Sequence, residues 1–192
     1  MNKIYLVTSN PGKVESFNNI LERMNFDFKI EMLDAEYPED KSEETTQGVA
    51  LAGAKYCADK YKKSVLTTDV GLFIKALNGF PGVNTKFSFN RIGNEGIIKL
   101  LEGKQDRSVD WILSIGYCEP NGEPVEFTST CRGTISETLR GDKGFGFDPI
   151  FIPEGYGATL AEDLEMRDNI SPFNEAIRKF AEWYQNKTVQ KI

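Results

Sequence analysis

The chain has 192 residues, 40% of them apolar and 27% charged, which suffices for one domain with a sizeable core. Its formal net charge of −6 argues against binding to a nucleic-acid polymer, because phosphate backbones are bound by basic surfaces. No apolar stretch reaches the length of a membrane span, and we expect no signal peptide. Cys57, Cys118 and Cys131 are widely spaced, which fits neither a disulfide framework nor a zinc site. We therefore expect a cytoplasmic protein, whose cysteines stay reduced.

The first predicted element is a strand at residues 4–7, whose continuous apolar run suits burial on both faces. A polar loop follows, made of Thr8, Ser9, Asn10, Pro11, Gly12 and Lys13. Apolar residues then recur at helical spacing over residues 14–24. A strand, loop and helix in this order point backbone N–H groups at an anion, and Lys13 adds positive charge there. The alternative is an ordinary turn in which Ser9 or Asn10 caps the helix.

Residues 34–47 are acidic and polar. Most of these carboxylates are expected to face solvent, although one could reach a metal ion bound near Asp69. A helix is predicted over residues 49–61, where small and apolar residues repeat at helical spacing.

The run from Val65 to Thr68 predicts a strand that presents Asp69 at its end, and Gly71 lets the chain turn sharply after it. Ligands of α/β proteins usually bind at the carboxyl ends of strands. Because the chain contains no histidine, a general base must be a carboxylate, lysine, tyrosine, thiolate or metal-bound hydroxide. This favours a role for Asp69, and the alternative is an aspartate that only caps the turn.

The middle of the chain predicts mainly strands. A turn-rich loop at residues 79–84 precedes a short amphipathic helix at residues 97–101. Apolar residues alternate strictly over residues 109–117, and a turn separates them from a second run at residues 125–131, which predicts an antiparallel hairpin or meander. Residues 132–139 could add one further strand.

The segment from Gly141 to Phe151 places three glycines around two phenylalanines and an aspartate. Such a loop can bring its backbone close to a flat ligand while a phenylalanine stacks on it. The alternative is a glycine-rich turn whose phenylalanines lie in the core. The last helix is predicted to begin around Ser171 and Pro172, and it carries a clean apolar stripe.

Five stretches in this order resemble the inosine triphosphatase-like nucleoside triphosphate pyrophosphatases, enzymes that hydrolyse non-standard purine triphosphates to the monophosphate and pyrophosphate. Residues 8–13 are similar to the family's T-x-N-x-x-K segment, and residues 68–72 resemble its D-D-S-G-L element. Residues 76–83 match A-L-x-G-x-P-G-V, residues 144–151 match G-F-G-[YF]-D-P-x-F, and residues 159–162 match T-x-A-E.

The resemblance implies a mixed α/β fold in which a long twisted central sheet and flanking helices form two lobes around a cleft, within one domain over residues 1–192. It also implies a homodimer that acts on a nucleoside triphosphate with Mg²⁺. Asp69 would be the catalytic general base and, with Glu39, a magnesium ligand, and Glu36 is the alternative to Glu39. The residues that would bind the substrate are Thr8, Ser9, Asn10, Pro11, Gly12, Lys13, Val70, Phe145, Gly146, Phe147, Asp148 and Arg167.

Four positions depart from the family pattern. Thr68 stands where the family has a second acid, and Val70 stands where it has a hydroxyl residue. Pro172 and Phe173 replace the histidine and arginine that recognise the 6-oxo group of the base, and neither side chain can donate a hydrogen bond. The alternatives to hydrolysis of ITP, dITP or XTP are therefore the same chemistry with altered base specificity, or a catalytically inactive nucleotide-binding protein.

Overall fold

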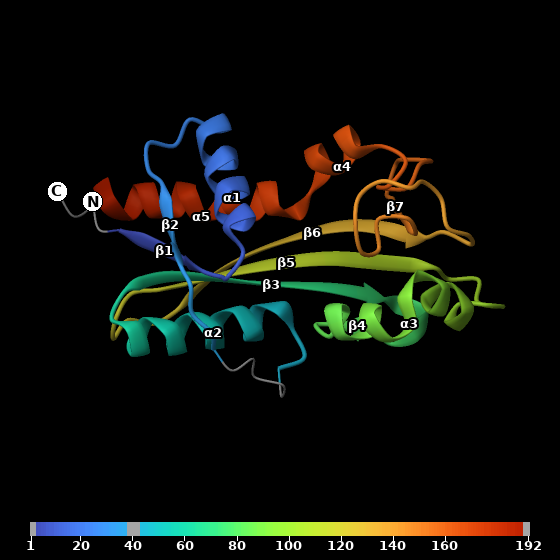
Figure 1. Ribbon diagram of the computed structural model, residues 1–192, viewed down its shortest axis with the longest axis horizontal. Coiled ribbons are helices and arrows are strands. Elements are labelled where there is room, and N and C mark those ends of the chain that lie inside the picture. The colour runs from blue at the N-terminus through green and yellow to red at the C-terminus, as the bar shows by residue number, and fades with distance from the viewer. Residues whose placement is uncertain (1–2, 38–42, 190–192) are drawn as a thin grey trace. The chain divides into compact units, whose positions relative to one another are not determined.

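The computed structural model describes residues 3–37 and 43–189 (Figure 1). Its strands are β1 (Ile4–Val7), β2 (Ile30–Leu33), β3 (Ser64–Ile74), β4 (Pro81–Gly82), β5 (Ser108–Cys118), β6 (Val125–Ile135) and β7 (Phe151–Pro153). Its helices are α1 (Pro11–Arg23), α2 (Thr46–Tyr61), the 3₁₀ turn η1 (Lys75–Leu77), α3 (Thr85–Leu100), α4 (Leu164–Ile170) and α5 (Pro172–Val189).

The strands form one seven-stranded sheet in the order β2-β1-β3-β5-β6-β7, with β4 paired to β3. β1 pairs in parallel with β2 and β3, whereas β4 and β7 are antiparallel to their neighbours. The predicted mixed α/β class is therefore confirmed. Among the described residues, no helix is both long enough and apolar enough to cross a membrane.

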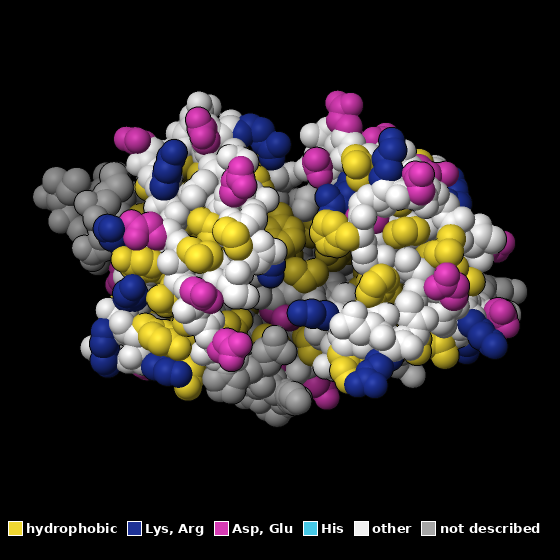
Figure 2. Space-filling view, viewed as in Figure 1, with side chains coloured by type: hydrophobic (Ala, Val, Ile, Leu, Met, Phe, Trp, Pro, Cys, Tyr) yellow, Lys and Arg dark blue, Asp and Glu magenta, His cyan; other side chains and the backbone are white. Residues whose placement is uncertain are grey.

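The chain divides into two compact units. The first consists of Met1–Asp69, Leu113–Ser129 and Phe173–Ile192, and the second consists of Val70–Ile112 and Thr130–Pro172. The strands β3, β5 and β6 thus contribute residues to both units. On the face shown in Figure 2, basic side chains are interspersed with acidic ones.

The core of the first unit gathers around Phe180 in α5, which is fully buried. Its ring centroid lies 5.6–6.1 Å from the rings of Phe17, Phe28, Tyr117, Phe127 and Tyr184. Most of these pairs meet edge to face or tilted, the geometry that aromatic quadrupoles favour. This cluster explains the apolar stripe predicted for the last helix, which begins at Pro172 as expected.

Within the first unit, α1 and α5 lie on one face of the strands and α2 lies on the other (Figure 1). Successive side chains of a strand point to opposite faces, and β5 illustrates this at two neighbouring positions. Tyr117 contacts Phe180 of α5, whereas Gly116 lies directly against the backbone of Ala50 in α2. The small residue at 116 therefore lets α2 approach the sheet closely.

The core of the second unit is an apolar cluster that includes Ile74, Ile97, Ile150 and Phe151, all at most 1% exposed. Trp111 packs edge-on against Phe151 at a centroid distance of 5.9 Å. The cluster draws on strands β3, β5, β6 and β7 and on helices α3 and α4, so it joins segments far apart in the sequence.

Three predictions about the strands and helices are wrong. The strand carrying Asp69 does not end there, because β3 continues to Ile74 and its pairing with β4 holds Leu72 and Phe73 in the sheet. The short helix expected at residues 97–101 is the end of a longer α3, which is interrupted at Gly93. Residues 132–135 extend β6, and the structure has no separate strand over residues 136–139, all of which are described.

Replacing Gly116 with alanine is expected to lower the free energy of unfolding by about 1–3 kcal/mol, because overpacking forces backbone shifts. A Cβ at this position would lie 2.2 Å from the carbonyl oxygen of Ala50. Gly157→Ala is the matched control, since a Cβ there meets no atom within 4 Å. Chemical denaturation measures both variants, and equal stabilities would contradict the described contact between α2 and β5.

Candidate functional site

The loop between β1 and α1 leads into the N-terminus of a thirteen-residue helix. Asn10 is the N-cap, and its side-chain oxygen accepts a hydrogen bond from the N–H of Gly12 at 2.9 Å. Pro11 occupies the first turn, where its missing N–H is no loss. Gly12 and Lys13 are exposed beside this helix N-terminus. The capping interpretation of Asn10 is confirmed. The N–H of Lys13 donates to the carbonyl oxygen of Asn10 at 3.1 Å, so what suits this loop to an anion is the positive end of the helix dipole and the exposed side chain of Lys13.

Thr8 stabilises the same loop, since its hydroxyl oxygen accepts the N–H of Asn10 at 3.1 Å. Its own N–H donates to the carbonyl oxygen of Leu33 at 3.1 Å, which ties the end of β1 to β2. Ser9 between them is exposed. The residues predicted to hold phosphate groups therefore form one ordered, solvent-accessible turn.

Asp69 lies within β3 and is half-buried. Two residues earlier, the hydroxyl of Thr67 donates to the carbonyl oxygen of Ala50 at 2.6 Å, which fixes β3 to α2. Because side chains alternate along a strand, Asp69 shares the α2 face with Thr67. α2 turns into β3 through Lys62, which has left-handed backbone angles, so the helix runs antiparallel to the strand. Asp69 therefore lies toward the N-terminal turn of α2.

In the second unit, the carboxylate of Asp148 organises the loop of residues 144–148. Asp148 is 6% exposed, and its Oδ2 atom accepts hydrogen bonds from the N–H of Phe145 at 2.9 Å and from Nε of Arg167 at 2.8 Å. The guanidinium carbon of Arg167 lies 4.5 Å from the centroid of the Phe145 ring. A cation over an aromatic face is attractive, so Asp148 and Arg167 together fix the direction of Phe145.

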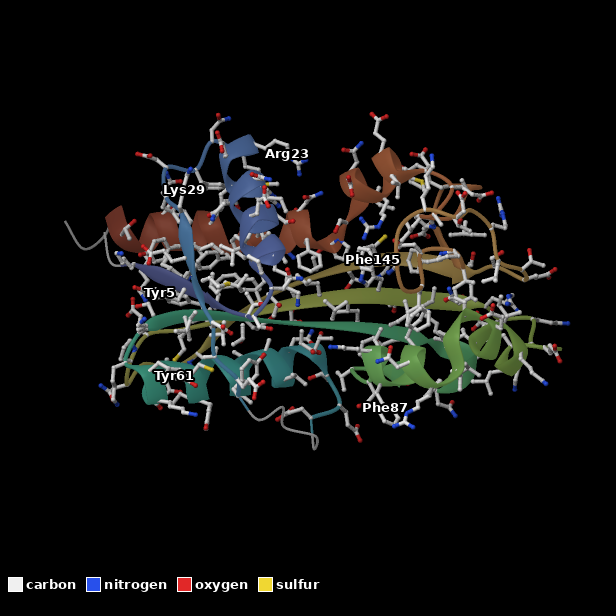
Figure 3. The ribbon with its side chains drawn as sticks, viewed as in Figure 1. Tyr5, Arg23, Lys29, Tyr61, Phe87 and Phe145 are labelled. Carbon is white, nitrogen blue, oxygen red and sulfur yellow. The ribbon has the colours of Figure 1, made fainter. Side chains whose placement is uncertain are left out.

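The two phenylalanines of this loop have different surroundings. Phe145, labelled in Figure 3, is 73% exposed, whereas Phe147 is 9% exposed and packs edge-on against Phe89 at 5.2 Å. Phe147 therefore belongs to the core, and Phe145 is the ring available for stacking on a flat ligand. The core interpretation is therefore confirmed for Phe147, whereas stacking on a ligand stays a prediction for Phe145.

Two glycines make the loop possible. Gly144 and Gly146 have φ angles of 75° and 61°, which other residues rarely adopt. A Cβ on Gly144 would also lie 2.3 Å from Oδ2 of Asp148, so a side chain there would displace the carboxylate.

The T-x-A-E stretch at residues 159–162 stabilises the loop of residues 144–148 through hydrogen bonds and adds no reactive group to it. The N–H of Ala161 donates to the carbonyl oxygen of Asp148 at 3.2 Å. The carboxylate of Glu162 accepts the N–H of Thr159 at 2.7 Å and pairs with Arg140 at 3.0 Å. The hydrogen bond from Thr159 and the charge of Arg140 lower the pKa of Glu162.

Asn94 of α3 is a residue of this region that sequence reasoning missed. Its side-chain amide donates to the carbonyl oxygen of Gly146 at 3.0 Å, and the two residues are 52 positions apart. The only local signal in the sequence is a Gly-Asn pair inside an otherwise helical stretch.

The predicted metal ligands are incompletely placed. Glu39 lies outside the described residues, and Glu36 is exposed. Within residues 3–37 and 43–189, no group of three or more Asp, Glu, Cys or His side chains is arranged to hold a metal ion. Mg²⁺ nevertheless binds with one or two carboxylates when substrate phosphates and water complete its shell, so a site built from Asp69 and one glutamate fits its chemistry. The assignment of Glu39 stays a prediction.

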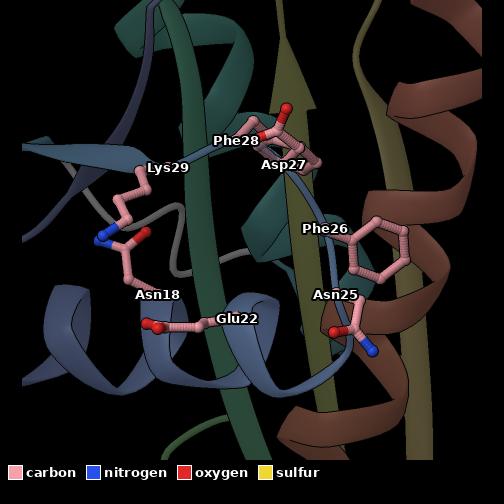
Figure 4. Close-up of a pocket in the computed structure, with 7 residues that line it drawn as sticks. All are labelled: Asn18, Glu22, Asn25, Phe26, Asp27, Phe28 and Lys29. Atoms are coloured by element: carbon pink, nitrogen blue, oxygen red, sulfur yellow. The ribbon is translucent and has the colours of Figure 1, made fainter.

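A pocket lies between α1 and the loop that leads to β2, and none of the predicted site residues line it (Figure 4). Its walls come from Asn18, Glu22, Asn25, Phe26, Asp27, Phe28 and Lys29. Both polar atoms of the Asn18 amide are hydrogen-bonded to the backbone of Ile30, at 2.9 and 3.0 Å. This asparagine therefore holds β2 in place.

Comparison with known proteins relates both halves of the chain to one family. Residues 4–183 match the Ham1 family. The chain is 47% identical over 185 residues to the dITP/XTP pyrophosphatase of Methanopyrus kandleri, covering 96% of this chain and 97% of that protein. It is 41% identical over 182 residues to the dITP/XTP pyrophosphatase of Thermococcus kodakarensis, covering 94% and 96% of the two chains.

Solved structures agree with this relationship. The fold resembles that of a HAM1 protein from Coxiella burnetii with a TM-score of 0.83 and 26% identity, covering 97% of this chain and 100% of that one. It also resembles the Staphylococcus aureus Ham1 protein with a TM-score of 0.82 at 24% identity, covering 96% and 100%, a likeness that concerns the fold alone.

Replacing Arg167 with methionine is expected to lower the free energy of unfolding by about 3 kcal/mol, because it leaves the buried carboxylate of Asp148 without its cation. Arg91→Met is the matched control. Arg91 also lies over an aromatic ring, at 5.0 Å from the centroid of Phe87, but Arg91 and Phe87 are both exposed. We expect less than about 1 kcal/mol from that change. Equal losses of unfolding free energy in the two variants would show that the Arg167–Asp148 ion pair adds no more stability than an exposed cation–aromatic pair.

Proposed function

The chain belongs to the Ham1 family, and from this premise we propose that it hydrolyses dITP, XTP and related non-standard purine triphosphates to the nucleoside monophosphate and pyrophosphate. The observation that carries the proposal is the identity of 47%, over nearly the full length of both chains, to a dITP/XTP pyrophosphatase. The resemblance found in the sequence motifs is confirmed by the family match. Such an activity would remove these nucleotides from the cellular pool.

The phosphate groups bind at the start of α1. The positive end of the helix dipole favours an anion there, and Lys13 adds a full charge. Asn10 holds this turn in shape through its cap, and its exposed amide is available to a phosphate oxygen. Thr8, Ser9, Pro11 and Gly12 complete the same turn.

Asp69 acts as the general base. It takes a proton from a water molecule that attacks the α-phosphorus, and the bond from that phosphorus to the bridging oxygen breaks, releasing pyrophosphate. When bound, Mg²⁺ neutralises charge on the phosphate oxygens, and Asp69 with Glu39 or Glu36 would hold it. Val70 beside Asp69 has no hydroxyl, so the hydrogen bond expected from a serine there must come from elsewhere.

The base stacks on the exposed ring of Phe145, whose direction Asp148 and Arg167 set. Gly146 keeps the backbone beside this ring free of side-chain atoms. Pro172 and Phe173, the first residues of α5, have no side-chain hydrogen-bond donors. Selection for a 6-oxo purine must therefore use donors at other positions. The same chemistry on a different base is therefore the second candidate function. A homodimer and a cytoplasmic location stay predictions.

The first test measures pyrophosphate release from dITP, XTP and the common nucleotides. Wild-type protein is expected to turn over dITP and XTP fastest, and Asp69→Asn is expected to lower kcat by roughly 10²–10⁴-fold because the general base is lost. Asp27→Asn is the control, since Asp27 is exposed at the pocket of Figure 4 and should leave kcat unchanged. Equal rates for wild type and Asp69→Asn would leave a nucleotide-binding protein without this activity.

The second test removes the metal. Chelation by EDTA is expected to abolish turnover, and Mg²⁺ should restore it, because charge on the triphosphate must be neutralised for water to attack. Measuring the free energy of unfolding with and without EDTA serves as the control and should give the same value. Full activity in EDTA would exclude a magnesium-dependent mechanism.

A further inference from the structure

The helix α3 contains an interruption that places one polar side chain against the loop of residues 144–148. Gly93 has φ 61° and ψ −166°, so the helical path breaks there and resumes with Asn94. Asn94 is 8% exposed, and its amide nitrogen donates to the carbonyl oxygen of Gly146 at 3.0 Å. The break in the helix is therefore what directs this buried amide toward the loop.

The amide oxygen of Asn94 points to a function outside the helix. An asparagine at the start of a helical segment ordinarily uses this oxygen to cap a nearby backbone N–H. Here the oxygen is buried, and no described residue donates a hydrogen bond to it. Leaving a buried carbonyl without a donor is unfavourable, and such a group calls for an explanation. The Asn94 side chain therefore does not cap its own helical segment, and its amide nitrogen donates to Gly146 instead.

Gly146 needs this restraint more than its neighbours do. A Cβ built on it would meet no atom within 4 Å, so there is open space on that side of its backbone, and glycine has the greatest backbone freedom. The residues on either side are held differently. The N–H of Phe145 is bound by Asp148, and the ring of Phe147 packs on Phe89, which also belongs to α3. The hydrogen bond from Asn94 thus fixes the peptide between the exposed ring and the buried ring.

We propose that Asn94 is a positioning residue for nucleotide binding, which holds the Gly146 carbonyl and thereby sets the face that Phe145 offers to a purine base. It acts through the loop and does not touch the substrate. The inference rests on the proposed function in that the ligand of Phe145 is taken to be the base of a nucleoside triphosphate. A residue with this role affects binding of the base, whereas binding of phosphate groups at the start of α1 does not depend on it.

The test compares Asn94→Leu, which keeps the size of the side chain and removes its polar atoms, with Asn90→Leu, the same change at an exposed position of α3. Calorimetry measures the affinity for dITP and for inorganic pyrophosphate in the presence of Mg²⁺. Both variants and their parent carry Asp69→Asn, so that hydrolysis of the nucleotide is slow during the measurement. Chemical denaturation measures the stability of each protein.

Asn94→Leu is expected to weaken dITP binding roughly fivefold to tenfold, the effect of about one hydrogen bond, and to leave pyrophosphate binding within twofold of the parent. Asn90→Leu is expected to change neither. The inference is overturned if dITP affinity of Asn94→Leu equals that of Asn90→Leu, or if dITP and pyrophosphate weaken equally, as loss of structure would cause. It also fails if the parent binds no dITP.

The two proposals fail separately. If protein with Asp69 intact releases no pyrophosphate from any triphosphate, the proposed function is wrong, yet the comparison of affinities still decides the role of Asn94.

Discussion

The buried carboxylate of Asp148 is the interaction on which the geometry of the exposed loop depends. It binds the backbone N–H of Phe145 and the guanidinium of Arg167, which in turn lies over the Phe145 ring. Phe145 itself is 73% exposed and has little packing of its own to hold it. A ring that contacts a ligand has to be exposed, and an exposed ring cannot be held by packing in the core. The neighbouring Arg167–Asp148 ion pair therefore sets its orientation. Gly144, which cannot carry a side chain beside this carboxylate, is part of the same constraint.

In the first unit, the alternation of side chains along the strands places the second group of site residues. Thr67 of β3 and Gly116 of β5 both face α2, one through a hydrogen bond and the other through close contact with the same residue, Ala50. This fixed packing of α2 on the sheet determines where Asp69 lies. At the end of β1, the cap formed by Asn10 orders the turn that carries Lys13. Rigid elements therefore support each residue to which we assign a chemical role.

Much of the fold could be predicted from the sequence, because α1 and α5 have regular apolar periodicity and because small and apolar residues recur along α2. The extent of β3 could not, since Gly71 is as typical of a turn as of a strand whose pairing with β4 extends it. The motifs identified the glycine-rich loop, but two phenylalanines separated by one glycine look alike in sequence. Only packing against Phe89 assigns Phe147 to the core. Asn94 was missed because its contact joins residues 52 positions apart.

In the proposed complex, the phosphate groups and the base bind to different segments of the chain. The proposed reaction cleaves the bond between the α- and β-phosphates of a non-standard purine nucleotide. The most direct measurement is identification of the products that purified protein forms from dITP with Mg²⁺. We expect dIMP and pyrophosphate in equal amounts. Formation of dIDP and inorganic phosphate, or the absence of any product, would contradict it.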